Sequence, residues 1–268
     1  MISLAPASSA RGSHLAFALI WLPRHRRRDA LVFFRFCREV DDIADEGGRT
    51  NEEKSRLLDE WVEAVEGRTL PEELEEVVTR NGIDRTLLAE IIRGCAMDVR
   101  PSRFQTFGDL EQYCWRVACA VGLVSIRIFG CTDPGSVAYA ENLGHALQLT
   151  NILRDAGEDA GMERIYIPLE DLARFGISEQ DFLAGLPGGS FLELMRFEAG
   201  RARARFHAAI PPAPDARALL PAEIMKSLYS TLLSRLEKMD FPVFKKRLRL
   251  GRIEKLAIAL ATCLRRRQ

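Results

Sequence analysis

Two aspartates four residues apart, Asp41 and Asp45, follow Arg38 in the stretch FRFCREVDDIADE, residues 34–46. On a helix this spacing places both carboxylates on one face, about 6 Å apart along the axis. Like charges at this spacing repel each other and weaken a helix slightly, so a bare surface helix gains nothing from the pair. A bound cation would remove that cost, which makes the pair a candidate metal site.

A second stretch, LGHALQLTNILRDAGEDAGMERIYIP, repeats the arrangement with Asp155 and Asp159. Gln148 and Asn151 lie on the same helical line as these aspartates, at spacings of three and four residues. They interrupt an otherwise apolar helix, and buried amides are costly unless they are hydrogen-bonded. The line of polar residues therefore indicates a polar cavity or a bound ligand.

Both stretches combine an Asp-x-x-x-Asp pair with an arginine just before it or beside it, Arg38 in the first and Arg154 in the second. Carboxylates without histidine or cysteine are hard oxygen ligands suited to Mg²⁺, which also binds substrate phosphates. Arginine binds phosphate oxygens in bidentate fashion. One such pair is a weak signal because ion-pair ladders are common on helices, but two matched copies predict a diphosphate held through Mg²⁺ between two helices.

The elements that position these residues are helices, because apolar residues recur at helical spacing through most of the chain. The pattern predicts helices over residues 28–44, 52–66, 71–80, 84–99, 107–129, 134–157, 190–209 and 221–238. No segment alternates convincingly at period two, and there is no repeat or long linker. The sequence therefore predicts an all-α fold in a single domain over residues 1–268.

The overall composition narrows the classes of function. Apolar residues make up 47% of the 268 residues, enough for a sizeable core, and 38 basic residues balance 38 acidic ones, so no global charge points to nucleic acid. The six cysteines form no Cys-x-x-Cys pair, which favours reduced thiols. No window reaches the roughly 18 apolar residues of a membrane span, so we expect a soluble, cytoplasmic protein. The basic end of the chain, FKKRLRLGRIEK to CLRRRQ, is most simply a solvated face, although such a tail can also contact an anionic membrane surface.

Three motifs, CREVDDIADE, YCWRVACAVG and LQLTNILRDAGEDAGMERIYIPLEDL, resemble those of the squalene and phytoene synthase family, whose members join two prenyl diphosphates head to head. The similarity extends from LPRHRRRDAL to IMKSLYSTLLSRLEKMDFPVFKKRLRL, nearly the whole chain. It leans toward the bacterial branch that makes presqualene diphosphate for hopanoids, with the carotenoid-forming phytoene synthases next. The resemblance implies an isoprenoid synthase fold around a central cavity, with the two aspartate pairs facing each other.

The resemblance also implies roles for individual residues. It assigns Asp41, Asp45, Asp155 and Asp159 to Mg²⁺ and diphosphate binding, Arg38 and Arg154 to diphosphate contacts, and Tyr113 to catalysis. The residues expected to line the cavity are Tyr113, Val117, Val121, Gly122, Gln148, Asn151, Tyr166 and Tyr229. Read from spacing alone, Tyr113, Val117 and Tyr229 fit core packing equally well or better.

Two positions depart from the family pattern. A serine near the N-terminus that contacts diphosphate is represented by Ser13, while His14 stands where we expect the serine itself. Phe34 stands one turn before Arg38, where many members have a tyrosine that faces the cavity. Loss of that hydroxyl mildly favours an enzyme that stops at the cyclopropyl diphosphate.

The implied reaction needs Mg²⁺, for which Mn²⁺ can substitute, and NADPH only if the product is squalene. The expected partners are prenyl diphosphate substrates, downstream isoprenoid enzymes and, through the basic tail, the membrane surface; the oligomeric state stays open. The alternatives are a phytoene synthase acting on two geranylgeranyl diphosphates, a terpene cyclase or head-to-tail elongase, and a non-catalytic relative. Cyclases and elongases usually carry other acidic motifs, and a scaffold would not need all four aspartates.

Overall fold

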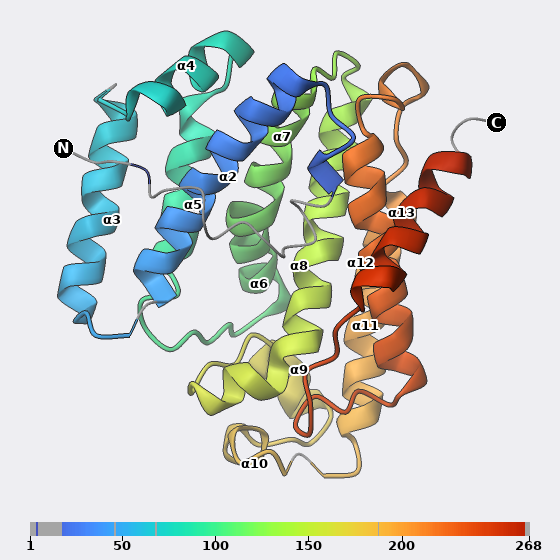
Figure 1. Ribbon diagram of the computed structural model, residues 1–268. Helices are drawn as coiled ribbons and strands as arrows, with labels where there is room; N and C mark the ends of the chain where they lie inside the picture. The colour runs from blue at the N-terminus through green and yellow to red at the C-terminus, as the bar shows by residue number, and fades with distance from the viewer. Residues whose placement is uncertain (1–3, 5–17, 46, 68, 187, 266–268) are drawn as a thin grey trace.

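The structure, a computed structural model, describes residue 4 and residues 18–45, 47–67, 69–186 and 188–265. In chain order its helical elements are α2 (Arg24–Asp45), α3 (Asn51–Glu66), α4 (Glu72–Asn81), α5 (Arg85–Ala96), α6 (Phe107–Cys114), the π-helical turn η2 (Trp115–Cys119), α7 (Ala120–Phe129), α8 (Gly135–Gly161), α9 (Leu169–Arg174), α10 (Glu179–Leu183), α11 (Phe191–Ala208), the short turn η3 (Ala213–Asp215), α12 (Leu220–Lys238) and α13 (Arg252–Arg265). Within the described residues the one β-type contact is an isolated bridge between Arg103 and Ile165. The predicted all-α fold is confirmed (Figure 1).

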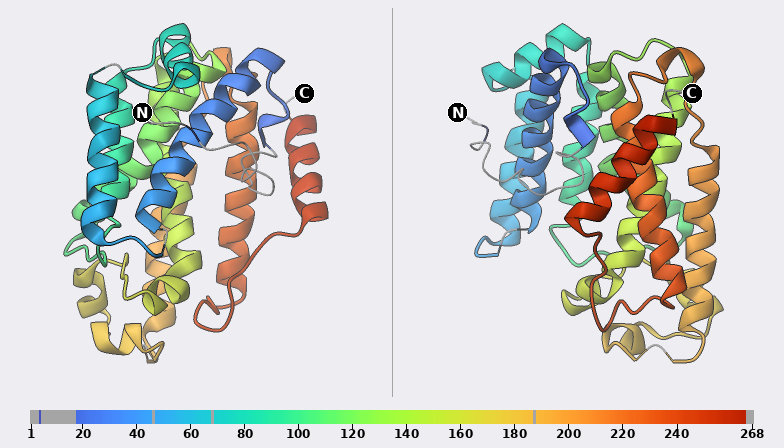
Figure 2. Two further views of the ribbon diagram at one scale, coloured as in Figure 1. Left: turned by 60° about the vertical axis from the view of Figure 1, so that its left-hand side comes forward. Right: turned by 45° about the vertical axis from the view of Figure 1, so that its right-hand side comes forward.

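Helix α8 lies in the middle of the molecule and organises the helices around it. It packs against α6, η2 and α7, and also against α11 and α12 (Figure 1). Helix α2 packs against α3, α4, α5 and α7, while α13 lies on the outside over α12 (Figure 2). The helices that carry the two aspartate pairs, α2 and α8, thus belong to neighbouring groups within one bundle.

Local sequence determines where several helices begin and end. Thr50 and Glu53 form a capping box at the start of α3, and Thr106 and Asp109 form another at the start of α6. Each box satisfies backbone N–H groups that the first helical turn leaves without partners. Helix α7 ends at Gly130, whose φ of 80° is a left-handed conformation that glycine adopts without strain.

The predicted helix over residues 107–129 is interrupted by the π-helical turn η2. Gly144 of α8 lies directly against this turn, since an added Cβ there would come within 2.7 Å of the Cys119 Cα. The Cys119 thiol also donates to the Glu141 carbonyl of α8 at 3.1 Å. A π turn widens the helix locally and changes the faces that follow, which is why such turns are frequent at functional sites. Apolar spacing alone predicts only an uninterrupted helix here.

Helix α13, at the basic end of the chain, lies outside the predicted set of helices. The short helices α9 and α10 also lie outside the predicted set. Across the ranges that the structure describes, no helix combines the length and the apolarity needed to cross a bilayer.

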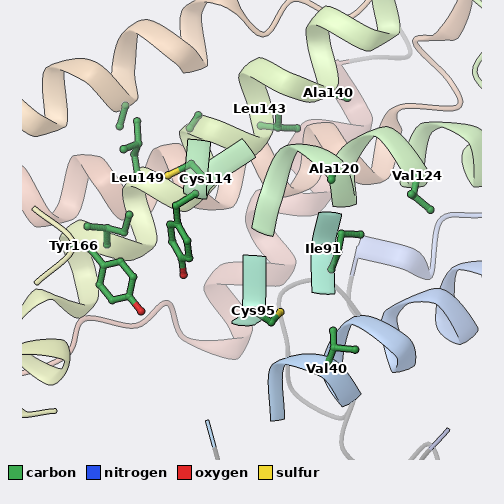
Figure 3. Close-up of a cluster of buried hydrophobic side chains, with 14 of the residues drawn as sticks. Val40, Ile91, Cys95, Cys114, Ala120, Val124, Ala140, Leu143, Leu149 and Tyr166 are labelled. Carbon is green, nitrogen blue, oxygen red and sulfur yellow. The ribbon is translucent and has the colours of Figure 1, made fainter. Parts of the chain in front are cut away.

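Buried apolar residues from many helices form one connected cluster. Figure 3 shows part of it, with Val40 from α2, Ile91 and Cys95 from α5 and Leu143 from α8, and with Tyr166 to one side. The six cysteines are free thiols, four of them buried. This core holds α2, α5 and α8 in register and so fixes where their polar residues meet.

Candidate active site

The first aspartate pair lies in the last turns of α2, where Arg38 engages it. Arg38 donates from Nη1 to Asp41 at 2.8 Å and from Nη2 to Asp42 at 2.6 Å. Burial and the nearby negative charge of Asp45 raise the pKa of Asp41 to about 6. The Asp41 side chain is still 47% exposed, so solvent moderates this effect and a ligand could reach the carboxylate.

The second pair lies near the end of α8, and two arginines bind its first member. Arg154 donates to Asp155 from Nε at 2.7 Å and from Nη2 at 2.5 Å, in bidentate geometry. Arg247, from the segment before α13, also binds Asp155 at 2.8 Å and reaches Glu158 at 2.9 Å. Burial and the neighbouring Asp155 raise the pKa of Asp159 to about 7. The Asp159 carboxyl group therefore ionises less readily than an ordinary aspartate.

Arg164 connects the two pairs. It follows α8 in the chain, donates from Nη1 to Asp45 at 3.0 Å and from Nη2 to the Asp98 carbonyl at 3.1 Å. Its positive charge also acts on Asp159, whose pKa it lowers against the larger raising effects. The ends of α2 and α8 thus face the same space, with an arginine between them.

Asp98, just after α5, is a carboxylate in the interior that accepts hydrogen bonds from three hydroxyl groups. Tyr166 donates at 2.5 Å, Tyr113 at 2.7 Å and Ser102 at 3.0 Å. Burial raises the pKa of Asp98, and these hydrogen bonds only partly offset the rise. The negative charge of Asp98 also raises the pKa of both Asp41 and Asp159, so it lies within electrostatic reach of both pairs. The two tyrosines named from the sequence are therefore held together by a residue that the sequence did not single out.

Carboxylates outnumber arginines in this region. The acidic residues are Asp41, Asp42, Asp45, Asp98, Asp155, Glu158 and Asp159, and the arginines in contact with them are Arg38, Arg154, Arg164 and Arg247. An excess of negative charge attracts cations, and oxygen donors without histidine or thiolate suit Mg²⁺.

The described residues also allow a test of whether Mg²⁺ fits. The Asn151 Oδ1 atom is buried and accepts no hydrogen bond from them, so it is a spare oxygen beside the second pair. Among these same residues no three acidic, histidine or cysteine side chains converge on one point. A metal here would therefore take one or two carboxylates and complete its shell with phosphate oxygens and water, which is the usual mode of Mg²⁺. The donor set fits that ion.

A narrow gap, too small to hold a water molecule, lies beside the second pair. It is lined by Ile152, Ala156, Asp159, Arg164, Tyr166, Ile167 and Phe182. Charged side chains and apolar side chains therefore meet around this gap.

The other residues named from the sequence lie at different places around these groups. Asn151 donates to Gln148 at 3.3 Å, so the two amides form one pair on α8. Tyr229 of α12 lies near Arg154. Burial lowers the pKa of Arg154, but the hydrogen bond to Asp155 and the nearby Tyr229 outweigh burial, so the pKa is raised. Phe34 is half-buried and packs against Phe33 with ring centroids 5.3 Å apart.

Val117, Val121 and Gly122 are half-buried on η2 and α7. Val117 packs over Gly94 of α5, where an added Cβ would come within 2.7 Å of it. Gly122 lies against the α8 backbone, with an added Cβ 3.1 Å from the Ala140 carbonyl oxygen. These residues bring the helices close together around the site. Ser13 lies outside the described residues.

The charged residues of this region that sequence analysis did not name include Asp98, Arg164 and Arg247. Arg164 stands in the same quoted stretch as the second pair, five residues after Asp159, and that closeness is the one signal that could have found it. Arg247 looked like part of a basic tail, and Asp98 has no second carboxylate three or four residues away.

The amino-acid sequence matches the family described as Squalene/phytoene synthase over residues 9–254. The chain belongs to this family. Among its relatives, phytoene synthase 1 of Arabidopsis thaliana is 35% identical over 248 residues, which cover 87% of this chain and 58% of that protein. The presqualene diphosphate synthase of Rhodopseudomonas palustris is also 35% identical, over 260 residues that cover 94% of this chain and 93% of the relative. The chain thus spans less than two thirds of the plant member of the family but almost all of the bacterial one.

A solved structure agrees with this chain in fold. A dehydrosqualene synthase in complex with ligand superposes with a TM-score of 0.82 over 96% of this chain and 93% of the other, at 23% identity. The predicted isoprenoid synthase fold is confirmed. The chain is equally identical to the phytoene synthase and to the presqualene diphosphate synthase, so these two comparisons favour neither branch of the family. They do not support the expected preference for the presqualene diphosphate synthases.

Proposed function

We propose that this chain condenses two prenyl diphosphates head to head and releases diphosphate, and that two farnesyl diphosphates giving presqualene diphosphate are its main reaction. The observation that carries the proposal is the meeting of two Asp-x-x-x-Asp helices across one arginine, Arg164, which contacts Asp45 and the Asp98 backbone. Membership of the squalene/phytoene synthase family supports the same chemistry.

The arginines and carboxylates would divide the work of binding diphosphate. Arg38, Arg154, Arg164 and Arg247 now bind carboxylates, and the oxygens of a diphosphate offer them a better matched, more highly charged partner. The aspartates freed in this way would hold Mg²⁺. When bound, Mg²⁺ would neutralise charge on the diphosphate and make it a better leaving group.

The bond changes follow from that arrangement. The C–O bond of one allylic diphosphate breaks and its electron pair leaves with the diphosphate, so an allylic cation remains beside apolar walls that exclude water. The double bond of the second substrate attacks this cation, and loss of a proton closes the cyclopropane ring. Tyr113 and Tyr166 donate to Asp98, and burial, with Asp98 nearby, raises the pKa of both hydroxyls. They keep their own protons, so we assign the released diphosphate as the proton acceptor.

A second candidate reaction is phytoene formation from two geranylgeranyl diphosphates, with prephytoene diphosphate as the intermediate. This chain is as similar in sequence to the Arabidopsis phytoene synthase as to the Rhodopseudomonas presqualene diphosphate synthase, which supports phytoene formation as the second candidate. This reaction uses no NADPH, whereas continuation from presqualene diphosphate to squalene requires hydride from NADPH.

The test is to incubate the purified chain with farnesyl or geranylgeranyl diphosphate and Mg²⁺, with and without NADPH, and to identify the products by mass spectrometry. We expect presqualene diphosphate from farnesyl diphosphate, whether or not NADPH is present. Phytoene from geranylgeranyl diphosphate alone would establish the second candidate instead. If neither substrate releases diphosphate, the proposed enzyme activity is wrong.

The site assignment has its own test. Asp41→Asn and Asp155→Asn should each slow diphosphate release by about 100-fold or more, because each removes a charged oxygen ligand. Asp59→Asn, at an exposed position on α3, is the matched control and should leave the rate unchanged. Full activity in the Asp41 and Asp155 variants would contradict the assignment.

A further inference from the structure

The outer face of α13 carries a row of large aliphatic side chains. Ile253, Leu256, Leu260 and Leu264 follow one another at spacings of three, four and four residues, so they form one stripe. Their exposed fractions are 86%, 46%, 45% and 64%. Isolated exposed leucines are common on soluble proteins, but a contiguous row on one helix marks a surface that contacts something apolar.

The inner face of α13 holds the helix in place. Ala259 and Thr262 are buried, and the helix packs against α12. Thr262 donates from Oγ1 to the Ser227 hydroxyl of α12 at 3.0 Å. Figures 1 and 2 show α13 on the outside of the bundle. The stripe therefore points outward because of the way the helix is attached.

Basic residues surround the stripe without carboxylates to neutralise them. Arg249, Arg252 and Arg265 are exposed and form no ion pair with any described residue. The one acidic residue of α13, Glu254, is already bound by Arg235. Lys255 is half-buried on the inner face, one turn before Ala259, where burial and the charges of Arg252 and Arg249 lower its pKa, so it is not one of these exposed cations. The surface around the stripe is therefore positively charged.

We propose that α13 docks this protein on an anionic lipid bilayer, with Ile253, Leu256, Leu260 and Leu264 inserted at the acyl boundary and the flanking cations bound to lipid phosphates. A helix with an apolar face and basic flanks is the arrangement that lies in the interface plane of a membrane. At 14 residues α13 is about 21 Å long, shorter than the roughly 30 Å hydrocarbon core, so it lies on the bilayer and does not span it.

The charges favour a bilayer over a second copy of the chain. Two copies packed through this stripe would bring their unpaired cations together, and like charges placed close to each other oppose association. An anionic surface instead supplies the missing counter-charges, at about 1 kcal/mol for each basic residue near it.

The test measures sedimentation of the full chain with vesicles, without substrate, so its result does not depend on the proposed reaction. We expect strong binding to equimolar phosphatidylcholine and phosphatidylglycerol, weak binding to phosphatidylcholine alone, and loss of binding at high salt. Leu256→Glu with Leu260→Glu should weaken binding at least about tenfold. Arg249→Gln with Arg252→Gln should weaken it to a similar extent on anionic vesicles alone.

Matched controls separate docking from general effects on the fold. Ile210→Glu changes an aliphatic residue that is 73% exposed elsewhere, and Arg127→Gln removes an exposed cation on α7; both should bind vesicles like the parent chain. Far-ultraviolet circular dichroism checks that every variant is folded. Equal sedimentation of the stripe variants and the parent, or no preference for anionic vesicles, would overturn the proposal. So would a dimer in solution that the stripe variants abolish, with no vesicle binding, because a second copy would then cover this face.

Discussion

Arginine side chains bind the acidic residues of the site and neutralise part of their charge in the free protein. Each aspartate pair has its own arginine, and Arg164 reaches from the end of α8 to Asp45 at the end of α2. A diphosphate with its metal would exchange these internal ion pairs for stronger ones. At the scale of single residues, binding is therefore a change of partners in a preformed charge network.

Asp98 provides the first prediction at this scale. Asp98→Asn should slow diphosphate release by roughly 10-fold to 100-fold, because an amide cannot accept from both tyrosine hydroxyls as the carboxylate does. The acid limb of the pH–rate profile should also move to lower pH, since Asp98 raises the pKa of Asp41 and Asp159. Steady-state kinetics across pH measure both effects.

Ser102→Ala is the matched control for Asp98. It removes one hydrogen bond to the same carboxylate and leaves both tyrosine contacts in place, so the pH–rate profile should stay where it is. An unmoved acid limb in Asp98→Asn would show that Asp98 acts only on folding.

Phe34 provides a second prediction, which concerns the product. Phe34→Tyr adds a hydroxyl one turn before Arg38 on a half-buried face of α2. We expect the parent chain to accumulate the cyclopropyl diphosphate and the variant to carry more of it to a linear product when NADPH is present. Product analysis by mass spectrometry measures the ratio. An unchanged ratio, at an unchanged rate of diphosphate release, would remove Phe34 as the residue that sets the end point.

The two aspartate pairs and the arginines beside them could be named from the sequence because each pair, with its arginine, lies within one short helical stretch. Asp98, Arg164 and Arg247 were not, because they come from three separate segments and meet only in the folded chain. No spacing rule connects Asp98 to Tyr166, although their side chains lie 2.5 Å apart.

At the scale of elements, sequence patterns predicted the long helices and missed what depends on contacts between them. The π-helical turn η2 lies where α8 comes close to it at Gly144. Helix α13 was missed for another reason, because basic residues stand on both sides of it and the whole segment was interpreted as one charged tail, although its apolar residues follow helical spacing. The π-helical turn belongs to packing between helices, which local apolar spacing does not contain.

The segment before α13 gives a prediction at this scale. It crosses α8 at Gly157, where an added Cβ would come within 2.7 Å of the Val243 carbonyl carbon. Gly157→Ala should therefore push the segment outward, separate Arg247 from Asp155 and lower the free energy of unfolding by about 1–3 kcal/mol. Urea denaturation and the rate of diphosphate release measure the two consequences.

Gly161→Ala on the same helix is the control, because nothing lies within 4 Å of its added Cβ. It should leave stability and activity nearly unchanged. Equal behaviour of the two alanine variants would mean that the segment does not need this close approach.

At the scale of the whole molecule, the free protein carries an uncompensated acidic region whose stability depends on pH. The pKa values of Asp41 and Asp159 rise from the ordinary 3.8 to about 6 and about 7. A raised carboxyl pKa adds stability that is fully present below about pH 3.8 and lost as the pH rises through these values. Without a ligand, these two groups therefore make the fold less stable at pH 8 than at pH 4.

Mg²⁺ with diphosphate should reverse that trend. We expect the ligand-induced rise in Tm to be larger at about pH 8 than at about pH 5.5, because protons compete with the metal for these carboxylates at acidic pH. Asp159→Asn should flatten the difference. Differential scanning calorimetry at the two pH values gives the answer, and a larger rise at acidic pH would contradict the prediction.

The cysteines beside the site give the protein an internal reporter of opening. Cys37 lies one helical turn before Asp41, and burial together with that carboxylate raises its thiol pKa, as it does for Cys95. Since only the thiolate reacts, alkylation at these positions measures how often the fold opens around the aspartates. Mg²⁺ with a non-cleavable farnesyl thiodiphosphate should slow labelling of Cys37 several-fold while Cys263 on α13 reacts as before. Equal slowing at both positions would mean that the ligand tightens the whole molecule.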